Sequence, residues 1–580
     1  MIQTARRAIK RTLARLLSPA QPAPLPAEKT VELVPWERLL ETERAEWDDA
    51  RLRARGGPKV LVATSVGGHE GLTPVETLLG IALTLRGAEV HFLLCDAFLP
   101  ACMHATLKRP QQHAKFVAGG PQTHLCARCW GDGQAIYGPL GLPVHRYSDL
   151  TDPAAREEAR QLAQNVAAAD IPAYRLDDLA VGEHALAGAL RYFARGDLLA
   201  EPDGEAVLRR YFEASILATR ATQRLLDQVD FASSCFNHGI YVPQGLIGEV
   251  LRQRGVRVVN WNTAYRKRCF IFSHDDTYHH TLMNEPTSAW ENLPWTPEME
   301  RQTMDYLVSR WYGTHDWVWF HEHPQEDLSA IVAELGLDLN KPLIGLLTNV
   351  MWDAQLHYPA NAFPSMLDWV LRTIAYFAAR PDLQLVIRVH PAEIRGTVPS
   401  RQKIADEIAR AFPTLPANVF VIPPESQIST YAIMLKCDTV IIYGTKTGVE
   451  LTSFGIPVIV AGEAWIRNKG VTMDAADAAG YFDLLDTLPR GARLDEATMQ
   501  RARKYAFHFF FRRMIPVSVM EPLSGWPPYR VSADSLAPLR PGGDPGLDII
   551  CDGILHEGIP PGRPFIYPAE YSAGGEAAPV

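Results

Sequence analysis

The sequence predicts an α/β protein with two successive domains, each built on a doubly wound parallel sheet. In residues 57–97, an apolar β-branched segment, a glycine-rich turn, a segment of helical periodicity and a second apolar segment follow one another. This order of strand, loop, helix and strand is typical of the start of a parallel sheet. Apolar segments at 229–235 and 256–262 complete the first domain, and five more between residues 341 and 462 form the second.

The pattern changes along the chain, and these changes suggest the domain boundaries. Residues 1–30 predict a basic amphipathic helix with a Pro-rich tether, and 31–339 a first domain with a helical insert at about 151–230. Residues 340–498 form the second domain, and 499–580 hold an aromatic-rich helix expected to bridge back between the domains and a tail expected on the surface. Two such domains predict a cleft, with ligands bound beyond the carboxyl ends of the strands.

Composition excludes several functional classes. The 580 residues are 47% apolar and 21% charged, as in soluble globular proteins, and the net charge of −9 provides no basic field for nucleic acid. No apolar stretch has the length of a membrane-spanning helix, no signal peptide is visible, and eight cysteines are too few for a disulfide scaffold. We therefore expect a cytoplasmic protein. The basic N-terminal helix can lie on an anionic membrane surface, which predicts peripheral contact with an inner membrane.

Polar residues follow three predicted strands of the second domain, where each strand ends. The small residues of GTKTG supply hydroxyls, backbone N–H groups and a cation, which suit a phosphate, although the spacing is not that of a GxxxxGK[ST] loop. An alternative is a capped helix in which Thr447 and Glu450 satisfy only the helix itself. The candidate nucleotide-binding residues are Asn349, Arg388, His390, Glu393, Thr445, Lys446, Thr447 and Glu450.

Several motifs resemble one known family. HP-x-E after a strand, the small-residue loop with Glu before G-x-PVI, and the segments TNVMWDA and YAFHFFFRRMIP resemble the capsular polysaccharide biosynthesis family over about residues 340–520. Its members are bacterial glycosyltransferases of the GT-B type, so the resemblance implies two Rossmann-like domains facing a cleft. It further implies a nucleotide-sugar donor whose phosphates meet His390, Thr445 and Thr447 and whose ribose is held by Glu450. Related sialyl- and Kdo-transferring enzymes use CMP-sugars, but Lys446 in the loop leaves CMP- and UDP-linked donors both open.

The first strand-to-helix turn, TSVGGHEGLTP, carries the candidate catalytic residues. Inverting glycosyl transfer needs a base that takes the proton of the acceptor hydroxyl. GGHEGLTP is similar to the GH-x-x-P pattern of GT-B enzymes, which implies that His69 is this base, with Glu70 as its orienting partner or an alternative base. His238, after a later strand, would contact the acceptor. In a retaining enzyme His69 would instead contact acceptor or phosphate, and in the simplest alternative the two glycines only allow a tight turn.

Half of the cysteines fall within 35 residues, and two of them form a C-x-x-C pair. Cys95, Cys102, Cys126 and Cys129 would suit a tetrahedral structural Zn²⁺. A [4Fe–4S] cluster would need the same ligands, and four reduced cysteines without metal are the alternative. His104 or His124 could replace one of them.

Together these observations predict a glycosyltransferase that moves a sugar from a nucleotide sugar to a glycan or lipid-linked glycan in bacterial surface polysaccharide synthesis. We expect no catalytic Mg²⁺, because the histidine, the loop and helix ends would stabilise the departing phosphate. A nucleotide-sugar epimerase, which would need no acceptor, and a polyol-phosphate transferase are alternatives on the same fold. A non-catalytic glycan-binding assembly protein would lack nucleotide affinity.

Overall fold

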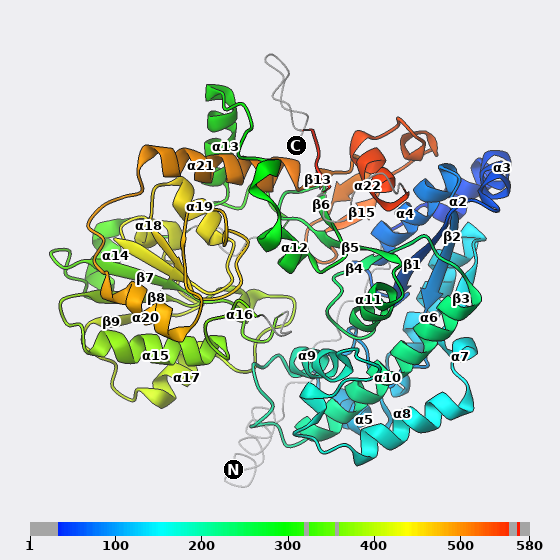
Figure 1. The fold of residues 1–580 in the computed structure, drawn as a ribbon, viewed down its shortest axis with the longest axis horizontal. Helices are drawn as coiled ribbons and strands as arrows, with labels where there is room; N and C mark the ends of the chain where they lie inside the picture. Colours follow the sequence, from blue (N-terminus) through cyan, green and yellow to red (C-terminus); the bar gives the residue numbers. More distant parts are fainter. Residues whose placement is uncertain (1–32, 318–323, 354–358, 556–564, 569–580) are drawn as a thin grey trace, which may run out of the picture. The chain divides into compact units, whose positions relative to one another are not determined.

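A computed structural model describes residues 33–317, 324–353, 359–555 and 565–568 of the chain (Figure 1). The predicted basic helix at the N-terminus, and the membrane contact expected of it, lie outside these residues. Among the helices described, none has the combination of length and apolar composition that crossing a bilayer requires.

The first domain is built on a seven-stranded mixed sheet. Its strands are β1 (Lys59–Ser65), β2 (Glu89–Leu94), β3 (Val144–Arg146), β4 (Ser233–Asn237), β5 (Arg257–Thr263), β6 (Cys269–His274) and β13 (Ile515–Pro516). Their order in the sheet is β13-β6-β5-β4-β1-β2-β3. The strands from β3 to β5 are parallel, whereas β6 and β13 are antiparallel to their neighbours.

The second domain is built on a six-stranded sheet in which every pairing is parallel. Its strands are β7 (Leu343–Leu347), β8 (Gln384–Arg388), β9 (Val419–Ile422), β10 (Thr439–Ile442), β11 (Val458–Val460) and β12 (Met473–Asp474). Their order is β12-β11-β10-β7-β8-β9. A separate short hairpin joins β14 (Met520–Pro522) to β15 (Tyr529–Val531).

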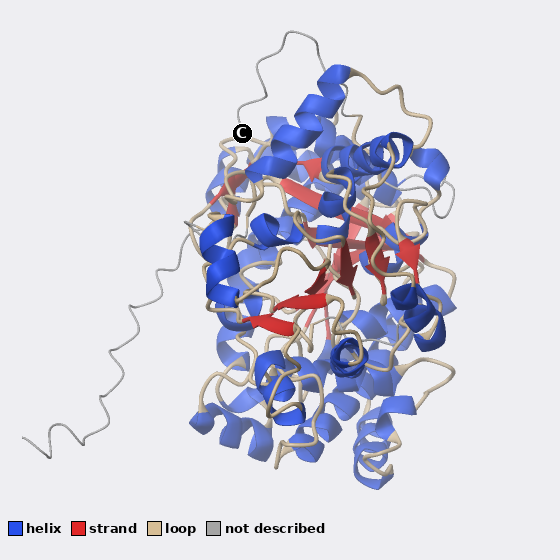
Figure 2. Ribbon diagram, turned by 90° about the vertical axis from the view of Figure 1, so that its left-hand side faces the viewer, coloured by secondary structure: helices blue, strands red, loops and turns tan. Residues whose placement is uncertain are grey.

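Helices cover the strands on both faces (Figure 2). The bounds of those before β7 are α2 (Trp36–Thr42), α3 (Arg44–Ala54), α4 (Thr73–Leu85), α5 (Pro110–Gly119), α6 (Cys126–Tyr137), α7 (Tyr147–Leu150), α8 (Pro153–Asn165), α9 (Val181–Phe193), α10 (Gly204–Gln228), α11 (Gln244–Gln253), α12 (Tyr278–Asn284), α13 (Pro297–Ser309) and α14 (Leu328–Leu335). Those after β7 are α15 (Met366–Ala378), α16 (Ala392–Arg395), α17 (Ile404–Ala411), α18 (Thr430–Met434), α19 (Thr447–Ser453), α20 (Ala478–Asp486), α21 (Glu496–Phe507) and α22 (Pro545–Leu555).

Alternate residues of each central strand are buried in different cores, as the period of two of a strand requires. In β1, Val60 belongs to the core on the side of α4, and Leu61 to the core on the side of α10 and α11. In β10, Val440 packs in the core with α19 and α21, and Ile441 in the core with α15 and α17. Both faces of both sheets are therefore buried under helices. The predicted fold class, two doubly wound Rossmann-like domains, is confirmed.

The C-terminal segment differs from the surface tail expected from its Pro/Gly-rich composition. After α21 and a π-helical turn (His508–Arg512), β13 pairs with β6 at the edge of the first sheet. Leu547, Ile550 and Ile554 of α22 are buried in the first domain's core beside α4. Burial of large apolar side chains, rather than exposure, thus fixes this segment, and β13 and α22 are part of the first domain.

Candidate functional site

The predicted site residues follow the strands at which each sheet reverses its chain order. In the first sheet this reversal lies between β1 and β4, whose following loops carry His69 and His238. In the second sheet it lies between β7 and β10, whose following loops carry Asn349 and Thr445. Doubly wound sheets bind ligands beyond the carboxyl ends of the strands at such reversals. The topology therefore places both sets of residues where this fold class binds ligands.

His390 follows β8, which pairs with β7. Its backbone N–H donates to Thr348 Oγ1 at 3.1 Å, and its Nδ1 accepts the backbone hydrogen of Ala392 at 3.0 Å. Because a backbone amide can only donate, the neutral ring carries its own proton on Nε2. The ring therefore presents an N–H donor, which suits the anionic oxygen of a phosphate.

The loop after β10 is tied to the loop after β7. The backbone N–H of Gly444 donates to Asn349 Oδ1 at 3.2 Å. The hydroxyl oxygens of Thr445 and Thr447 lie 3.1 Å apart, and the Thr447 amide donates to Thr445 Oγ1 at 3.4 Å. The structure thus brings Asn349 and the loop that carries both threonines together at one edge of the sheet.

Glu450 is turned into the protein instead. Its carboxylate is fully buried, accepts from Arg310 Nε at 3.1 Å and Lys446 Nζ at 3.2 Å, and accepts the hydroxyl hydrogen of Tyr431. Burial alone would raise the pKa of Glu450, but the charges of Arg310 and Lys446 lower it to about 2. Each charge is thus compensated inside the domain, where the pair anchors the loop. The ribose contact of Glu450 and the phosphate contact of Lys446 stay predictions.

Arg388 and Glu393 also make contacts inside the domain, and their predicted ligand contacts stay predictions. The Arg388 guanidinium donates to the carbonyl oxygens of Pro423 at 2.6 Å and Ser426 at 3.2 Å, and burial lowers its pKa to about 10. Glu393 Oε1 accepts the backbone hydrogen of Ile404 at 3.0 Å, and burial raises the pKa of this carboxyl to about 7. Both side chains hold neighbouring loops in place.

His69 has the same local geometry in the first domain as His390 has in the second. Its Nδ1 accepts the backbone hydrogen of Gly71 at 3.2 Å, so the neutral ring carries its proton on Nε2. Burial, followed by the charges of His104 and Arg191, lowers the pKa of His69 to about 3. The ring is therefore neutral at physiological pH and donates through Nε2, whereas a base needs a lone pair at that atom. Glu70, the alternative base, is exposed.

Gly67 and Gly68 are required by a close approach rather than by a tight turn. A Cβ at Gly67 would lie 2.9 Å from the Cα of Gly133, and a Cβ at Gly68 would lie 2.6 Å from the Cα of Cys129. Both contacts are to α6, which thus packs directly against the backbone of the His69 loop.

His238 adopts the left-handed backbone conformation, with φ of 64°. Its N–H donates to the carbonyl oxygen of Trp261 at 3.0 Å. The buried carboxylate of Glu76 supports this loop, because its Oε1 accepts from the backbone of Asn237 and from the Trp261 indole, each at 3.0 Å. Burial raises the pKa of Glu76 to about 7, although these hydrogen bonds lower it. A single acid thus fixes the backbone beside His238.

The C-terminal hairpin contributes an aromatic side chain beside His69. Trp526, between β14 and β15, is 55% exposed, and its ring meets the His69 ring edge-on at 6.4 Å between centroids. The Tyr529 hydroxyl donates to the carbonyl oxygen of Gly71 at 2.6 Å. An exposed indole next to a polar loop suits stacking against a sugar face.

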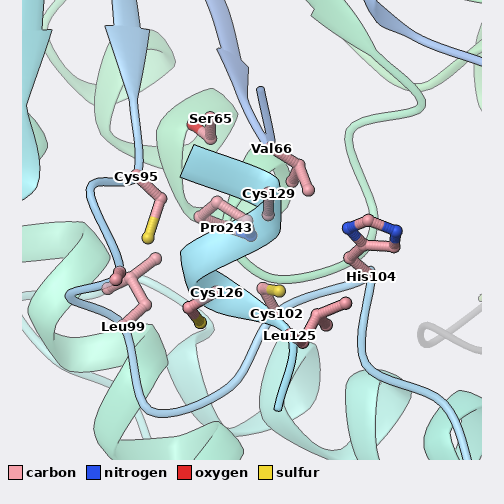
Figure 3. A pocket seen from close by; sticks show the side chains of 11 residues that line it. Ser65, Val66, Cys95, Leu99, Cys102, His104, Leu125, Cys126, Cys129 and Pro243 are labelled. Carbon is pink, nitrogen blue, oxygen red and sulfur yellow. The ribbon is translucent and has the colours of Figure 1, made fainter. Parts of the chain in front are cut away.

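All four predicted metal-ligating cysteines line one pocket, next to the His69 loop (Figure 3). Cys95 follows β2, Cys102 lies in the loop after it, and Cys126 and Cys129 lie in the first turns of α6. Within the described ranges, no three His, Cys, Asp or Glu side chains are arranged to hold one metal ion. The predicted convergence of the cysteines is observed, whereas the geometry of a single zinc site is not.

Residues 325–495 match the profile of a protein family described as "Capsule polysaccharide biosynthesis protein". The resemblance to this family is confirmed. The capsule-family region contains all eight candidate nucleotide-binding residues, from Asn349 to Glu450. No curated protein matches the chain.

Solved structures with a similar trace are distant. KpsC of Thermosulfurimonas dismutans matches as its β-Kdo 2,4 transferase with 13% identity, a TM-score of 0.31, and coverage of 47% of this chain and 79% of that chain. The β-Kdo 2,7 transferase of the same KpsC matches with 12% identity and a TM-score of 0.29, and the match covers 53% of this chain and 84% of that chain. The UDP-GlcNAc 2-epimerase from Neisseria meningitidis, bound to UDP-GlcNAc, matches with 10% identity and a TM-score of 0.25. This match covers 77% of this chain and 98% of that chain. At these values the likenesses carry no argument about function.

Three residues of the site have no motif and were missed in the sequence. Glu76 was hidden in an otherwise apolar helix, where a lone acid is itself a signal. Arg310 lies 140 residues before its partner Glu450, and Trp526 lies in the segment expected to form a surface tail. Only the three-dimensional fold brings them to the capsule-family region and to the His69 loop.

Proposed function

We propose that this protein is a glycosyltransferase that moves a sugar from a nucleotide-sugar donor to a glycan acceptor in capsule polysaccharide synthesis. One observation carries the proposal. In the capsule-family region, the Nε2–H of His390, the Asn349 amide and the hydroxyls of Thr445 and Thr447 belong to loops that follow three adjacent strands, β8, β7 and β10. These are donors without a fixed negative charge, which suit a diphosphate or monophosphate.

In this proposal the second domain stabilises the leaving group. The bond between the anomeric carbon and the phosphate oxygen breaks, and its electron pair stays on the nucleotide phosphate. The His390 N–H donates to that oxygen as its charge develops, and the threonine hydroxyls donate to the remaining phosphate oxygens. CMP- and UDP-linked sugars both satisfy this chemistry.

The first domain would present the acceptor. Trp526 would stack on an acceptor sugar, and His69 would donate through Nε2 to one of its oxygens. The acceptor hydroxyl forms the new bond to the anomeric carbon and loses its proton to a base. Glu70 suits that role better than His69, since a carboxylate accepts a proton directly. The basic N-terminal segment would hold the enzyme at the inner membrane near a lipid-linked acceptor.

Calorimetric titration with CMP, CDP, UDP, GDP and TDP tests the donor site. We expect one nucleotide to bind selectively, and His390→Ala to weaken its binding roughly ten- to a hundredfold, as the loss of a hydrogen bond to a charged group would. His315→Ala, which changes an unrelated histidine, serves as the matched control. Absence of binding by all five nucleotides in folded protein would refute the proposal. Turnover of a nucleotide sugar without acceptor would favour the epimerase.

A further inference from the structure

The pocket beside the His69 loop gathers thiols from three separate segments of the first domain. Cys95 comes from the end of β2, Cys102 from the loop after it, and Cys126 and Cys129 from α6. Apart from Ser65 and His104, the other lining residues are apolar (Figure 3). Four of the chain's eight cysteines line this one small pocket, whereas Cys437 is an isolated thiol buried in the core of the second domain.

The four thiols are close enough together to line one pocket. Metal ions bind cysteine as the thiolate, and a coordinating thiol is deprotonated by the metal itself.

The pocket is matched to an inorganic guest rather than to an organic one. Its cavity measures about 20 Å³, too little for an organic cofactor. A metal–sulfur bond of about 2.3 Å is much shorter than a van der Waals contact, so a metal core needs less free volume than an organic group. Inside the pocket wall, Nδ1 of His104 is buried and has no hydrogen-bond partner among the described residues.

The arrangement of the sulfurs distinguishes two kinds of metal site. A single zinc ion needs its ligands to converge on one point, and the described side chains include no such group of three. In an iron–sulfur cluster each cysteine binds a different iron atom, so the four sulfurs stand apart around the core. The four cysteines line one pocket from three separate segments (Figure 3), which suits the second arrangement.

We propose that Cys95, Cys102, Cys126 and Cys129 bind a [4Fe–4S] cluster. Each thiol gives its proton to solvent and its sulfur bonds to one iron of the cluster. The proposal does not depend on the glycosyltransferase activity. The cluster would have a positional role there, because the backbone N–H of Gly68 donates to Cys129 Sγ at 3.4 Å and so connects the cluster to the His69 loop. Such hydrogen bonds to the sulfurs also tune the reduction potential of a cluster.

The test uses the full chain, produced with added iron and purified without oxygen. Iron, acid-labile sulfide and zinc are measured per chain, together with the visible spectrum before and after reduction by dithionite. We expect ~4 irons and ~4 sulfides per chain and a visible absorption that bleaches on reduction. Cys102→Ser should lose most of the iron and sulfide, whereas Cys437→Ser, which removes a buried thiol in the second domain, should keep both.

Two outcomes would overturn the proposal. One zinc per chain without sulfide, lost in Cys102→Ser, would assign the pocket to a structural zinc ion. Folded wild-type protein with neither metal, even after anaerobic reconstitution with iron and sulfide, would leave four reduced thiols. The metal and sulfide content of the wild-type chain is sufficient for both results, and the loss of zinc in Cys102→Ser only locates the ion, so the question is decided even if the cysteine variants do not fold.

Discussion

The hydroxyl of Tyr241 donates a hydrogen bond to Asp353 Oδ1 at 3.0 Å. Tyr241 belongs to the loop after β4 in the first domain, and Asp353 to the loop after β7 in the second. The guanidinium carbon of Arg191 lies 5.1 Å from the centre of the Tyr241 ring. The bond therefore connects the two loops that we assign to acceptor and donor, at the points where the two sheets reverse their chain order.

Removal of this bond should reduce transfer more than it reduces stability. We expect Tyr241→Phe and Asp353→Asn each to lower kcat/KM, with a coupling energy of about 1 kcal/mol between them in a double-mutant cycle. Tyr376→Phe, which removes a hydroxyl that bonds Asp486 on the surface, is the control. Strictly additive effects of the two changes would mean that the bond has no part in the reaction.

Replacement of His69 by glutamine should preserve most of the activity, whereas replacement by alanine should not. If its Nε2–H donates to the acceptor, His69→Gln keeps a donor and most of kcat/KM, whereas His69→Ala loses roughly tenfold. With a pKa of about 3, His69 should also add no limb to the pH–rate profile between pH 5 and 8. A general base would behave differently, since both variants would then lose roughly a hundredfold or more. Glu70→Gln, measured beside them, tests the alternative base.

Replacement of Glu450 should damage the second domain before it affects any ligand. Glu450→Gln removes the charge that compensates buried Arg310 and Lys446, which should cost about 3 kcal/mol and lower Tm by roughly 5–10 °C. Glu496→Gln, at an exposed carboxyl, should leave Tm unchanged. Thermal unfolding and nucleotide titration separate the two roles. If Glu450→Gln keeps the Tm of the wild type but loses nucleotide affinity, the result would support the predicted contact between Glu450 and the ribose.

Glu76 should make the protein less stable as the pH rises. Its folded-state pKa of about 7 exceeds the ordinary value of 4.5 for a glutamate, so the folded state holds an extra proton between these values and stability falls with rising pH in this window. The full effect is about 3 kcal/mol. His69 and His238, whose pKa values are lowered by burial to about 3, act in the opposite direction between pH 3 and 6.5.

The Glu76 contribution is isolated by comparing variants. From pH 5 to 8, Tm should fall less, or rise more, in Glu76→Gln than in the wild type, because glutamine keeps the acceptor for Asn237 and Trp261 without titrating. Glu89→Gln, at a partly exposed carboxyl whose pKa is lowered, should not show this difference. Parallel Tm curves for wild type and Glu76→Gln would contradict the assignment.

Two glycines near α6 should respond to alanine with opposite signs. Gly68→Ala places a methyl 2.6 Å from the Cα of Cys129 and should destabilise the protein and displace the His69 loop. Gly131→Ala, inside α6, meets nothing within 4 Å and should stabilise by about 0.5–1 kcal/mol. Thermal unfolding measures both changes. An unchanged Tm in Gly68→Ala would show that α6 can move away from the loop.

The sequence was sufficient for the longer parallel strands, because these are apolar segments whose residues are mostly buried, whereas the short parallel strands β3 and β12, which have no fully buried residue, were missed. The positions of His69, His390 and Thr445 followed from the same rule, since polar residues after such strands meet at one edge. The antiparallel strands β6 and β13 were missed. β13 is the edge strand, and β6 lies between it and β5. Because β13 has two residues and its partner in β6 is 245 residues away, local periodicity carries no signal for it.

The sequence could not settle which side chains face the ligand. Glu450 and Arg388 occupy positions that suit a ligand in the motif, but whether a charge points outward depends on partners elsewhere in the chain. Arg310 and the backbone carbonyls of 423–426 are such partners, and neither is marked by spacing. The tautomers of His69 and His390 could not be predicted from the sequence either. Each depends on a hydrogen bond from the backbone N–H two residues later, and only the folded turn brings that group to the ring.

The return of the C-terminal segment to β6 has a consequence for synthesis. A chain leaving the ribosome completes the second domain while the first still lacks its edge strand, α22 and the Trp526 hairpin. The first domain is therefore the first to be synthesised and the last to complete its fold. Until β13 and α22 have left the ribosome, its core exposes the apolar surface that Ile515 and Leu547 cover in the folded protein. Premature termination between residues 500 and 545 would therefore remove α22, and the earliest stops also β13 and the Trp526 hairpin, from the domain that is synthesised first. The apolar surface left exposed on such chains would suit binding by a chaperone.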